Sequence, residues 1–300
     1  MWKLRSAVWP LIQAEELAPR IGAEGAPLVF DVTVQLAPAR FDGDYRPESG
    51  AAAWREAHVP GSRHIDLLSA LSDTDKRLHF SRPPVSRLVD DLAELGISRD
   101  TDVVLYDHGS MTWASRVWWL LRSIGFHARV LDGGLARWCT LDLPVESGAS
   151  DPARPVAAAD AVSGYRPLWA DRDDIVAIVD GRAPGTLVCA LAPAQFSGAE
   201  KTRYSRRGHI PGSRNLSAKS LLDDTGRVRD LDEVRALAST ALPGSGVPVV
   251  VYCGGGISAC LSALGLVLAG YDDIKIYDGS LEEWTADPAL PLVTLPGGEP

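Results

Sequence analysis

The sequence has little cysteine, no excess of basic charge and no long apolar run. Its four cysteines contain no CxxC pair, which argues against the usual zinc signatures and a dense disulfide framework. The formal net charge of −9 argues against a general binder of nucleic acid or anionic membranes, because phosphate surfaces select clustered Lys and Arg. No stretch approaches the length that spans a bilayer, and residues 1–17 lack the apolar core of a signal peptide. We therefore predict a cytoplasmic protein with no metal, cofactor, nucleic-acid or membrane partner.

Apolar side chains are present in the amount that a folded protein needs. Hydrophobic residues make up 46% of the chain and charged residues 23%, which is typical of a globular protein with sizeable cores. A length of 300 residues exceeds what one hydrophobic core usually organises. Two domains are therefore expected.

The chain contains one internal repeat, in which VVLYD…DGGLARW ends at Trp138 and VVVYC…DGSLEEW ends at Trp284. Asp107 and Cys253 each precede an Asp-Gly pair by 25 residues and the closing tryptophan by 31. Upstream of these lie the related tags HVPGS and HIPGS. The repeat predicts two copies of one domain, at 7–145 and 163–293. Residues 146–162 are rich in Pro, Ala, Ser and Asp and are expected to form a linker.

Each copy shows the pattern of a parallel β-sheet. A Val-rich run is followed by a turn, a helical stretch and a second β-rich run, which is the βαβ arrangement. The predicted fold class is therefore α/β, with a central, mostly parallel sheet flanked by helices in each domain. In the second copy the strand ends at Tyr252 and the helix ends at Gly270. Cys253 then lies at the C-terminal end of a strand and below a helix N-terminus, where open α/β sheets bind ligands.

The loop after Cys253 is suited to holding an anion. A thiol attacks sulfur only as the thiolate, so a nucleophilic cysteine needs its negative charge stabilised. Three glycines let successive backbone N–H groups turn toward one centre, and the helix adds its positive end. The same cradle suits the outer sulfur of a persulfide. The predicted cradle is formed by Gly254, Gly255, Gly256, Ile257, Ser258 and Ala259. Ser258 either directs its hydroxyl at the sulfur or caps the helix, which is the commoner role.

Several alternatives stay open at this point. Composition alone favours Cys253 as a small buried apolar side chain. The contrast with Asp107, in the same place of the first copy, instead favours one catalytic and one structural copy. A phosphatase or arsenate reductase with the same kind of loop needs an arginine near the end of the loop, and residues 254–259 contain none. A sulfur-relay or binding scaffold with little turnover is the other alternative.

The repeated tags, together with ASRVWWLL after Asp107, resemble the tandem-domain thiosulfate and 3-mercaptopyruvate sulfurtransferases of the rhodanese family over residues 7–293. The resemblance implies an inactive first domain, with Asp107 at the cysteine position, and a second domain in which Cys253 carries sulfur as a persulfide. It also implies a small sulfur donor, either 3-mercaptopyruvate or thiosulfate. The implied acceptor is cyanide, a thiol or a thioredoxin-like protein.

The sequence departs from the family at substrate-binding positions. A serine, histidine and aspartate relay proposed in the family maps to Gly255, His79 and Asp66, so only two of its members remain. Two family arginines that hold the donor anion are replaced by Leu191 and Gln195. Possible replacements lie just before HIPGS, namely Arg203, Arg206 and Arg207, although a solvated basic loop is about as common.

Overall fold

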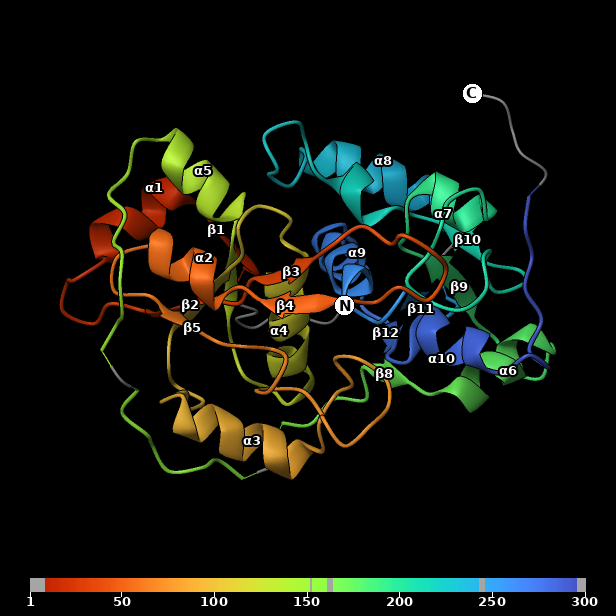
Figure 1. Ribbon diagram of the computed structural model, residues 1–300, viewed down its shortest axis with the longest axis horizontal. Helices are drawn as coiled ribbons and strands as arrows, with labels where there is room; N and C mark the ends of the chain where they lie inside the picture. The colour runs from red at the N-terminus through yellow and green to blue at the C-terminus, as the bar shows by residue number, and fades with distance from the viewer. Residues whose placement is uncertain (1–8, 152, 161–163, 243–245, 296–300) are drawn as a thin grey trace.

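The structure is a computed structural model that describes residues 9–151, 153–160, 164–242 and 246–295. It contains two five-stranded parallel sheets (Figure 1). The strand order of the first is β1 (Leu11–Ile12), β7 (Arg129–Leu131), β6 (Val103–Tyr106), β2 (Leu28–Asp31) and β5 (Arg63–His64). The order of the second is β8 (Trp169–Ala170), β12 (Ile274–Tyr277), β11 (Val249–Tyr252), β9 (Thr186–Cys189) and β10 (Arg214–Asn215). The predicted fold class is confirmed.

Helices flank both sheets. Those of the first domain are α1 (Ala14–Leu17), η1 (Ala18–Arg20), α2 (Ala51–Glu56), α3 (Val85–Glu94), α4 (Thr112–Ser123) and α5 (Gly134–Thr140). Those of the second are α6 (Arg172–Val179), α7 (Pro193–Ser197), η2 (Ala218–Leu221), α8 (Leu231–Ala241), α9 (Ser258–Leu268) and α10 (Ser280–Ala286). The central strands β6 and β11 are buried along their whole length, as expected where helices cover both faces of a parallel sheet.

One large hydrophobic cluster spans both domains, and a smaller cluster lies within each domain. Helix α4 packs against α9, the helix in the equivalent place of the second domain. Most residues of both helices are buried, and one apolar cluster joins Trp118 and Trp119 of the first domain to Leu264 of the second. Burying one large apolar side chain stabilises a fold by about 1.5–3 kcal/mol. The domain interface is therefore part of the core.

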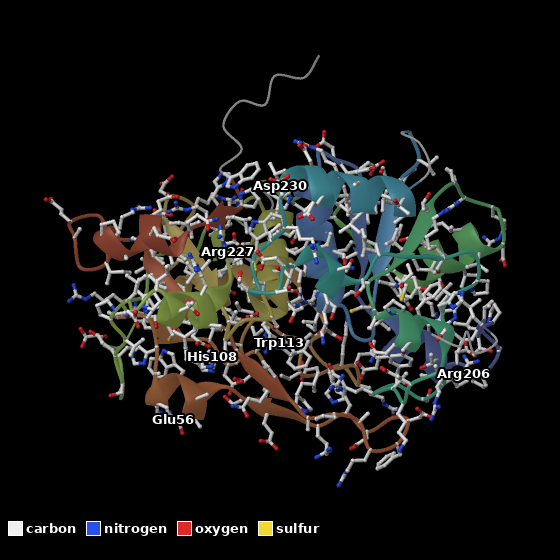
Figure 2. The ribbon with its side chains drawn as sticks, turned by 90° about the horizontal axis from the view of Figure 1, so that it is seen from above. Glu56, His108, Trp113, Arg206, Arg227 and Asp230 are labelled. Carbon is white, nitrogen blue, oxygen red and sulfur yellow. The ribbon has the colours of Figure 1, made fainter. Side chains whose placement is uncertain are left out.

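The two domains also exchange polar contacts at equivalent positions. The backbone N–H of Arg82 donates to Asp278 Oδ2 at 2.8 Å, and the N–H of Val228 donates to Asp132 Oδ1 at 2.8 Å. Asp132 and Asp278 belong to the two repeated Asp-Gly pairs. Each of these carboxylates therefore links its own domain, through a hydrogen bond, to a loop of the other domain. Figure 2 shows Arg227, which precedes Val228, on the side of the first domain.

The first domain has a two-stranded hairpin that has no counterpart among the described residues of the second domain. Strands β3 (Val34–Leu36) and β4 (Pro47–Ser49) form an antiparallel hairpin. Its tip reaches the second domain (Figure 1), where the N–H of Gly43 donates to the carbonyl of Thr202 at 3.0 Å. The hairpin therefore brings residues of the first domain to the end of the second sheet.

The described part of the expected linker lies along the first domain. Glu146 pairs with His58 through two backbone hydrogen bonds of 2.9 Å, and the N–H of Val156 donates to the carbonyl of Ala93 at 3.0 Å. Its predicted end at residues 162 and 163 lies outside the described residues. None of the described helices is long and apolar enough to cross a membrane.

Candidate active site

Cys253 follows β11 and lines a pocket between the domains. Its backbone N–H donates to Ser280 Oγ at 3.1 Å, and its carbonyl accepts the N–H of Leu281 at 3.1 Å. The residue is only 2% exposed. The pocket has a volume of about 320 Å³ and is lined by residues of both domains: Leu36, Tyr45, Ser110, Thr112, Trp113, Leu191, Gln195, Arg203, Tyr204, Lys219, Cys253, Gly254, Gly255, Ile257, Ser258 and Glu282. Trp113 lies between the two halves of the molecule in Figure 2.

The loop after Cys253 offers a run of free hydrogen-bond donors. None of the backbone N–H groups from Gly254 to Ala259 has an acceptor in the described part of the chain, although Gly256 and Ala259 are buried. Buried N–H groups without a partner are rare in folded proteins. Gly256 has a φ of +76°, and a methyl group on it would lie 2.7 Å from the carbonyl oxygen of Asp278. Only glycine fits this turn.

The Sγ atom of Cys253 accepts no hydrogen bond from any described residue, so these donors are open to a further group. The capping role expected for Ser258 is wrong. Helix α9 has Ile257 at its N-cap with no capping hydrogen bond from a side chain, and Ser258 lines the pocket.

The equivalent loop of the first domain binds its own carboxylate. Asp107 is 1% exposed. Its oxygens accept five backbone hydrogen bonds of 2.8–3.3 Å, from Gly109, Ser110, Met111, Trp113 and Ala114. A carboxylate oxygen is two bonds from Cβ, as is the outer sulfur of a cysteine persulfide. The two backbones differ in detail, since φ is positive at Gly109 and Met111 in one loop and at Gly256 in the other. The backbone N–H groups of the first loop thus form an anion-binding site that is occupied by the carboxylate of Asp107, a residue of the same loop.

Cys253 is the only one of the three buried cysteines that lines this pocket. Burial raises the pKa of Cys189 and of Cys260 to about 12 each, so both thiols stay protonated at neutral pH. The thiol of Cys260 also donates to the carbonyl of Gly256 at 3.2 Å. Cys139 is exposed and lies in α5.

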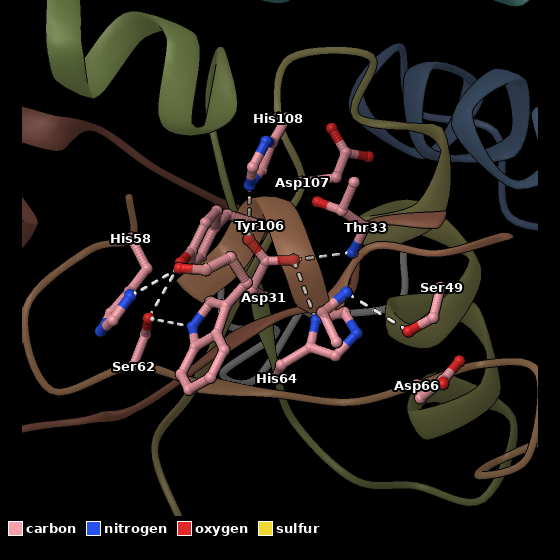
Figure 3. A network of polar contacts seen from close by, with 12 residues as sticks. Asp31, Thr33, Ser49, His58, Ser62, His64, Asp66, Tyr106, Asp107 and His108 are labelled. Carbon is pink, nitrogen blue, oxygen red and sulfur yellow. Dashed lines mark hydrogen bonds and ion pairs between the residues drawn. The ribbon is translucent and has the colours of Figure 1, made fainter. Parts of the chain in front are cut away.

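His79, which the family relay suggested as a candidate, contacts the second domain through Glu282. Its Nδ1 lies 2.6 Å from Glu282 Oε1, and its backbone N–H donates to both oxygens of that carboxylate at 3.3 Å. Asp66 accepts a hydrogen bond from Leu68 N–H at 3.0 Å within its own turn and has no contact drawn in Figure 3. The structure thus gives His79 a different carboxylate, Glu282, which corrects the expected relay.

Of the three candidate arginines, only Arg203 lines the pocket. Its Nε and Nη2 donate to the carbonyl of Ala37 at 3.2 and 2.9 Å, and burial lowers its pKa. Arg207 is paired with Asp42 of the hairpin at 2.9 Å. Arg206 lies at the outer end of the second domain (Figure 2), where it donates to the carbonyl of Thr285 in α10 at 3.0 Å and to that of Asp287 just after the helix at 2.7 Å.

Eight residues of the pocket wall were not predicted from the sequence: Leu36, Tyr45, Ser110, Thr112, Trp113, Tyr204, Lys219 and Glu282. Lys219 is exposed and has no ion pair with any residue that the structure describes. Leu191 and Gln195, at the positions of the family arginines, do line the pocket. A signal for Glu282 existed, because the first copy has Ala136 at the same place of the repeat.

The first domain holds a buried polar network beside Asp107 (Figure 3). Asp31 is fully buried and contacts His108 Nε2 at 3.0 Å, His64 Nδ1 at 3.3 Å and Thr33 N–H at 2.8 Å. Burial alone would raise the pKa of Asp31, but these hydrogen bonds outweigh it and lower the pKa. The hydrogen bond to Asp31 raises the pKa of His108. None of these residues lines the pocket.

Residues 13–141 and 168–287 match the rhodanese-like domain family. The chain is 33% identical over 251 residues to 3-mercaptopyruvate sulfurtransferase of Homo sapiens, covering 80% of this chain and 82% of the relative. It is 32% identical over 292 residues to the "Probable 3-mercaptopyruvate sulfurtransferase" of Pseudomonas aeruginosa, covering 95% and 98%.

Solved structures show the same fold. SseA from Escherichia coli superposes with a TM-score of 0.76 at 27% identity, covering 91% of this chain and 99% of that one. Tum1 from Saccharomyces cerevisiae gives a TM-score of 0.79 at 21% identity, covering 96% and 98%. The family resemblance is therefore confirmed: the chain belongs to the rhodanese-like family and, within it, to the tandem-domain sulfurtransferases.

Proposed function

We propose that this protein moves a sulfane sulfur from 3-mercaptopyruvate or thiosulfate to a thiophilic acceptor through a persulfide on Cys253. The observation that carries the proposal is the run of unpartnered N–H groups from Gly254 to Ala259 beside a pocket cysteine. These donors stabilise the negative charge of the persulfide as it forms. The acceptor is cyanide, a small thiol or a thioredoxin-like protein.

The chemistry has two half-reactions. The Cys253 thiolate first attacks the sulfur of the donor. With 3-mercaptopyruvate the C–S bond breaks, its electron pair forms the enolate of pyruvate, and the thiol proton of the donor ends on the enolate carbon. With thiosulfate the S–S bond breaks and sulfite leaves. The acceptor then attacks the outer sulfur, the S–S bond breaks, and the Cys253 thiolate is regenerated.

The charges on the pocket wall favour a donor with one negative charge. Arg203 and Lys219 contribute two cations, and Glu282 contributes one carboxylate. We assign the binding of the donor carboxylate to these two cations. They take the place of the arginines that the family has at the positions of Leu191 and Gln195. A dianion such as thiosulfate would meet Glu282 without a matching third cation. Arg207 is not assigned to the donor, because it forms an ion pair with Asp42 of the hairpin.

Steady-state kinetics test the proposal. Thiocyanate formation from cyanide is measured with 3-mercaptopyruvate and with thiosulfate, in the wild type, in Cys253→Ser and in the exposed-thiol control Cys139→Ser. We expect turnover in the wild type and the control, none in Cys253→Ser, and a higher kcat/KM for 3-mercaptopyruvate. A scaffold predicts no turnover in any of them. Hydrolysis of an aryl phosphate that depends on Cys253 would instead favour a phosphatase.

A further inference from the structure

Gly255 stands out in the loop because its backbone does not require glycine. Its φ lies outside the left-handed region, unlike that of Gly256. A methyl group on Gly255 would lie 3.3 Å from Glu282 Oε2 and 3.5 Å from the hydroxyl oxygen of Tyr45. The first distance is tighter than an ordinary van der Waals contact. The space into which a side chain at position 255 would extend is thus lined by the Glu282 carboxylate and the Tyr45 hydroxyl.

The Tyr45 hydroxyl is a donor without an acceptor. Tyr45 lines the pocket, and its hydroxyl makes no hydrogen bond with a described residue. Burial, together with the nearby charges of Glu282 and Cys253, raises its pKa, so that the phenol keeps its proton at neutral pH. It therefore offers a hydrogen bond to any acceptor that enters the pocket.

The ring of Tyr45 is held in place by the first domain and by the domain contact. It packs edge-on against His79 with ring centroids 4.1 Å apart, and lies 6.3 Å from the ring of Phe80. His79 is itself fixed by Glu282. The hairpin that carries Tyr45 is anchored to the second domain through Gly43 and Ala37. The hydroxyl is therefore positioned before a donor arrives.

We propose that Tyr45 is a catalytic residue that donates its hydroxyl hydrogen bond to the carbonyl oxygen of an α-keto thiol acid bound at Cys253. The inference rests on the proposed function and names the donor class. As the C–S bond breaks, its electron pair moves into the enolate and negative charge grows on the carbonyl oxygen. Tyr45 stabilises that charge without giving up its proton. Thiosulfate has no carbonyl oxygen, and the electron pair of its broken S–S bond stays on the sulfur of the sulfite that leaves.

The test compares Tyr45→Phe with Tyr271→Phe, a half-buried tyrosine that lies outside the pocket. Loss of one preorganised donor of this kind typically lowers kcat about 100-fold. We expect that loss with 3-mercaptopyruvate, a KM within about threefold of wild type, and thiosulfate turnover within about threefold. The control is expected to match the wild type. Retention of kcat with 3-mercaptopyruvate in Tyr45→Phe, or an equal loss with both donors, would overturn the proposal.

A rescue experiment excludes a merely structural role. In the Tyr45→Phe variant, the further substitution Gly255→Ser places a hydroxyl group next to the position that the Tyr45 hydroxyl occupied. Gly255→Ala adds only a methyl group there. The serine variant is expected to recover at least about tenfold in kcat with 3-mercaptopyruvate, and the alanine variant none. Equal behaviour of the two contradicts the proposal. The proposed function is judged separately by Cys253→Ser. A wild type that uses thiosulfate but not 3-mercaptopyruvate would remove the role of Tyr45 and leave the persulfide route intact.

Discussion

At the scale of single residues, the duplication has placed two different chemistries in one loop position. Asp107 fills its loop with a carboxylate that accepts five backbone hydrogen bonds. Cys253 leaves the corresponding donors without an acceptor. The Asp107 carboxylate occupies the first loop, whereas we propose that the donors of the second loop bind the anion that forms during sulfur transfer. The two loops therefore differ in whether a carboxylate of the chain itself occupies the backbone donors.

Removing the Asp107 carboxylate should be costly. In Asp107→Ala the five N–H groups lose their acceptor in a buried site, and each unsatisfied buried group costs about 1–3 kcal/mol unless water reaches it. We expect a loss of about 3 kcal/mol in the free energy of unfolding, measured with urea. Asp180→Ala, which removes an exposed ion pair with Arg182, is the control and should change little. A loss below about 1 kcal/mol for Asp107→Ala would mean that the carboxylate does not hold the loop.

The Asp31 network gives a pH-dependent contribution to stability. The folded state raises the pKa of His108 above its ordinary value of 6.5, because the ring hydrogen-bonds to Asp31. This stabilisation is fully present below about pH 6.5 and is lost as the pH rises through the raised pKa. His108→Gln should therefore destabilise the protein more at pH 6 than at pH 9, as judged by urea unfolding. An equal loss at both pH values would contradict the assignment.

At the scale of elements, α4 contributes more to the active site than its apolar sequence suggests. Arg116 lies in the middle of this helix and is 2% exposed. It forms an ion pair of 2.7 Å with Asp278 and donates to the carbonyls of Phe80 at 2.6 Å and Gly256 at 3.4 Å. One buried cation thus joins the first domain, the segment after His79 and the reactive loop. The loop after Cys253 therefore contacts a helix of the first domain.

Removing both partners of the Arg116–Asp278 pair should cost less stability than the two single losses added together. Arg116→Met leaves the Asp278 carboxylate largely buried without its cation, which typically costs about 3–5 kcal/mol. The double variant Arg116→Met/Asp278→Asn should cost clearly less than the sum of the two single variants, because the isolated charge is gone. Urea unfolding of the four proteins measures this coupling. Additive losses would mean that the two groups do not interact in solution.

The sequence predicted the elements better than the contacts between them. The equal spacings around Asp107 and Cys253 identified the duplicated βαβ unit, because the unit is encoded by local periodicity. The partner of His79 could not be predicted from the EE pair in DGSLEEW. Glu283 accepts a hydrogen bond from the Tyr277 hydroxyl at 2.8 Å, whereas Glu282 faces the pocket. The orientations of Glu282 and Glu283 depend on how the two domains pack against each other.

At the scale of the whole molecule, the two domains are joined by an apolar cluster to which both contribute. Their central helices are buried against each other, and each domain fastens a loop of the other through Asp132 or Asp278. The pocket draws its wall from both domains. The first domain, which has no cysteine at the position of Cys253, thus contributes the side chains of Tyr45, His79 and Arg116 to the pocket and its surroundings in the second domain.

Cutting the linker should leave the protein assembled. A specific protease site introduced within residues 146–151 interrupts the chain without removing the α4–α9 interface. We expect the two cleaved fragments to elute together in gel filtration and to keep thiocyanate formation within about twofold of the uncut protein. The uncut variant is the control for the inserted site. Separation of the fragments in native buffer would show that the covalent connection, and not the shared apolar cluster, holds the domains together.

The most direct test of the account is the mass of the peptide that contains Cys253. The full-length protein is incubated with 3-mercaptopyruvate or thiosulfate, digested under non-reducing conditions and analysed by mass spectrometry. The account predicts a gain of one sulfur, about 32 Da, on Cys253 alone, which disappears after addition of cyanide or a thiol. An unchanged Cys253 peptide with both donors, or a gain on Cys189, Cys260 or Cys139 instead, would contradict it.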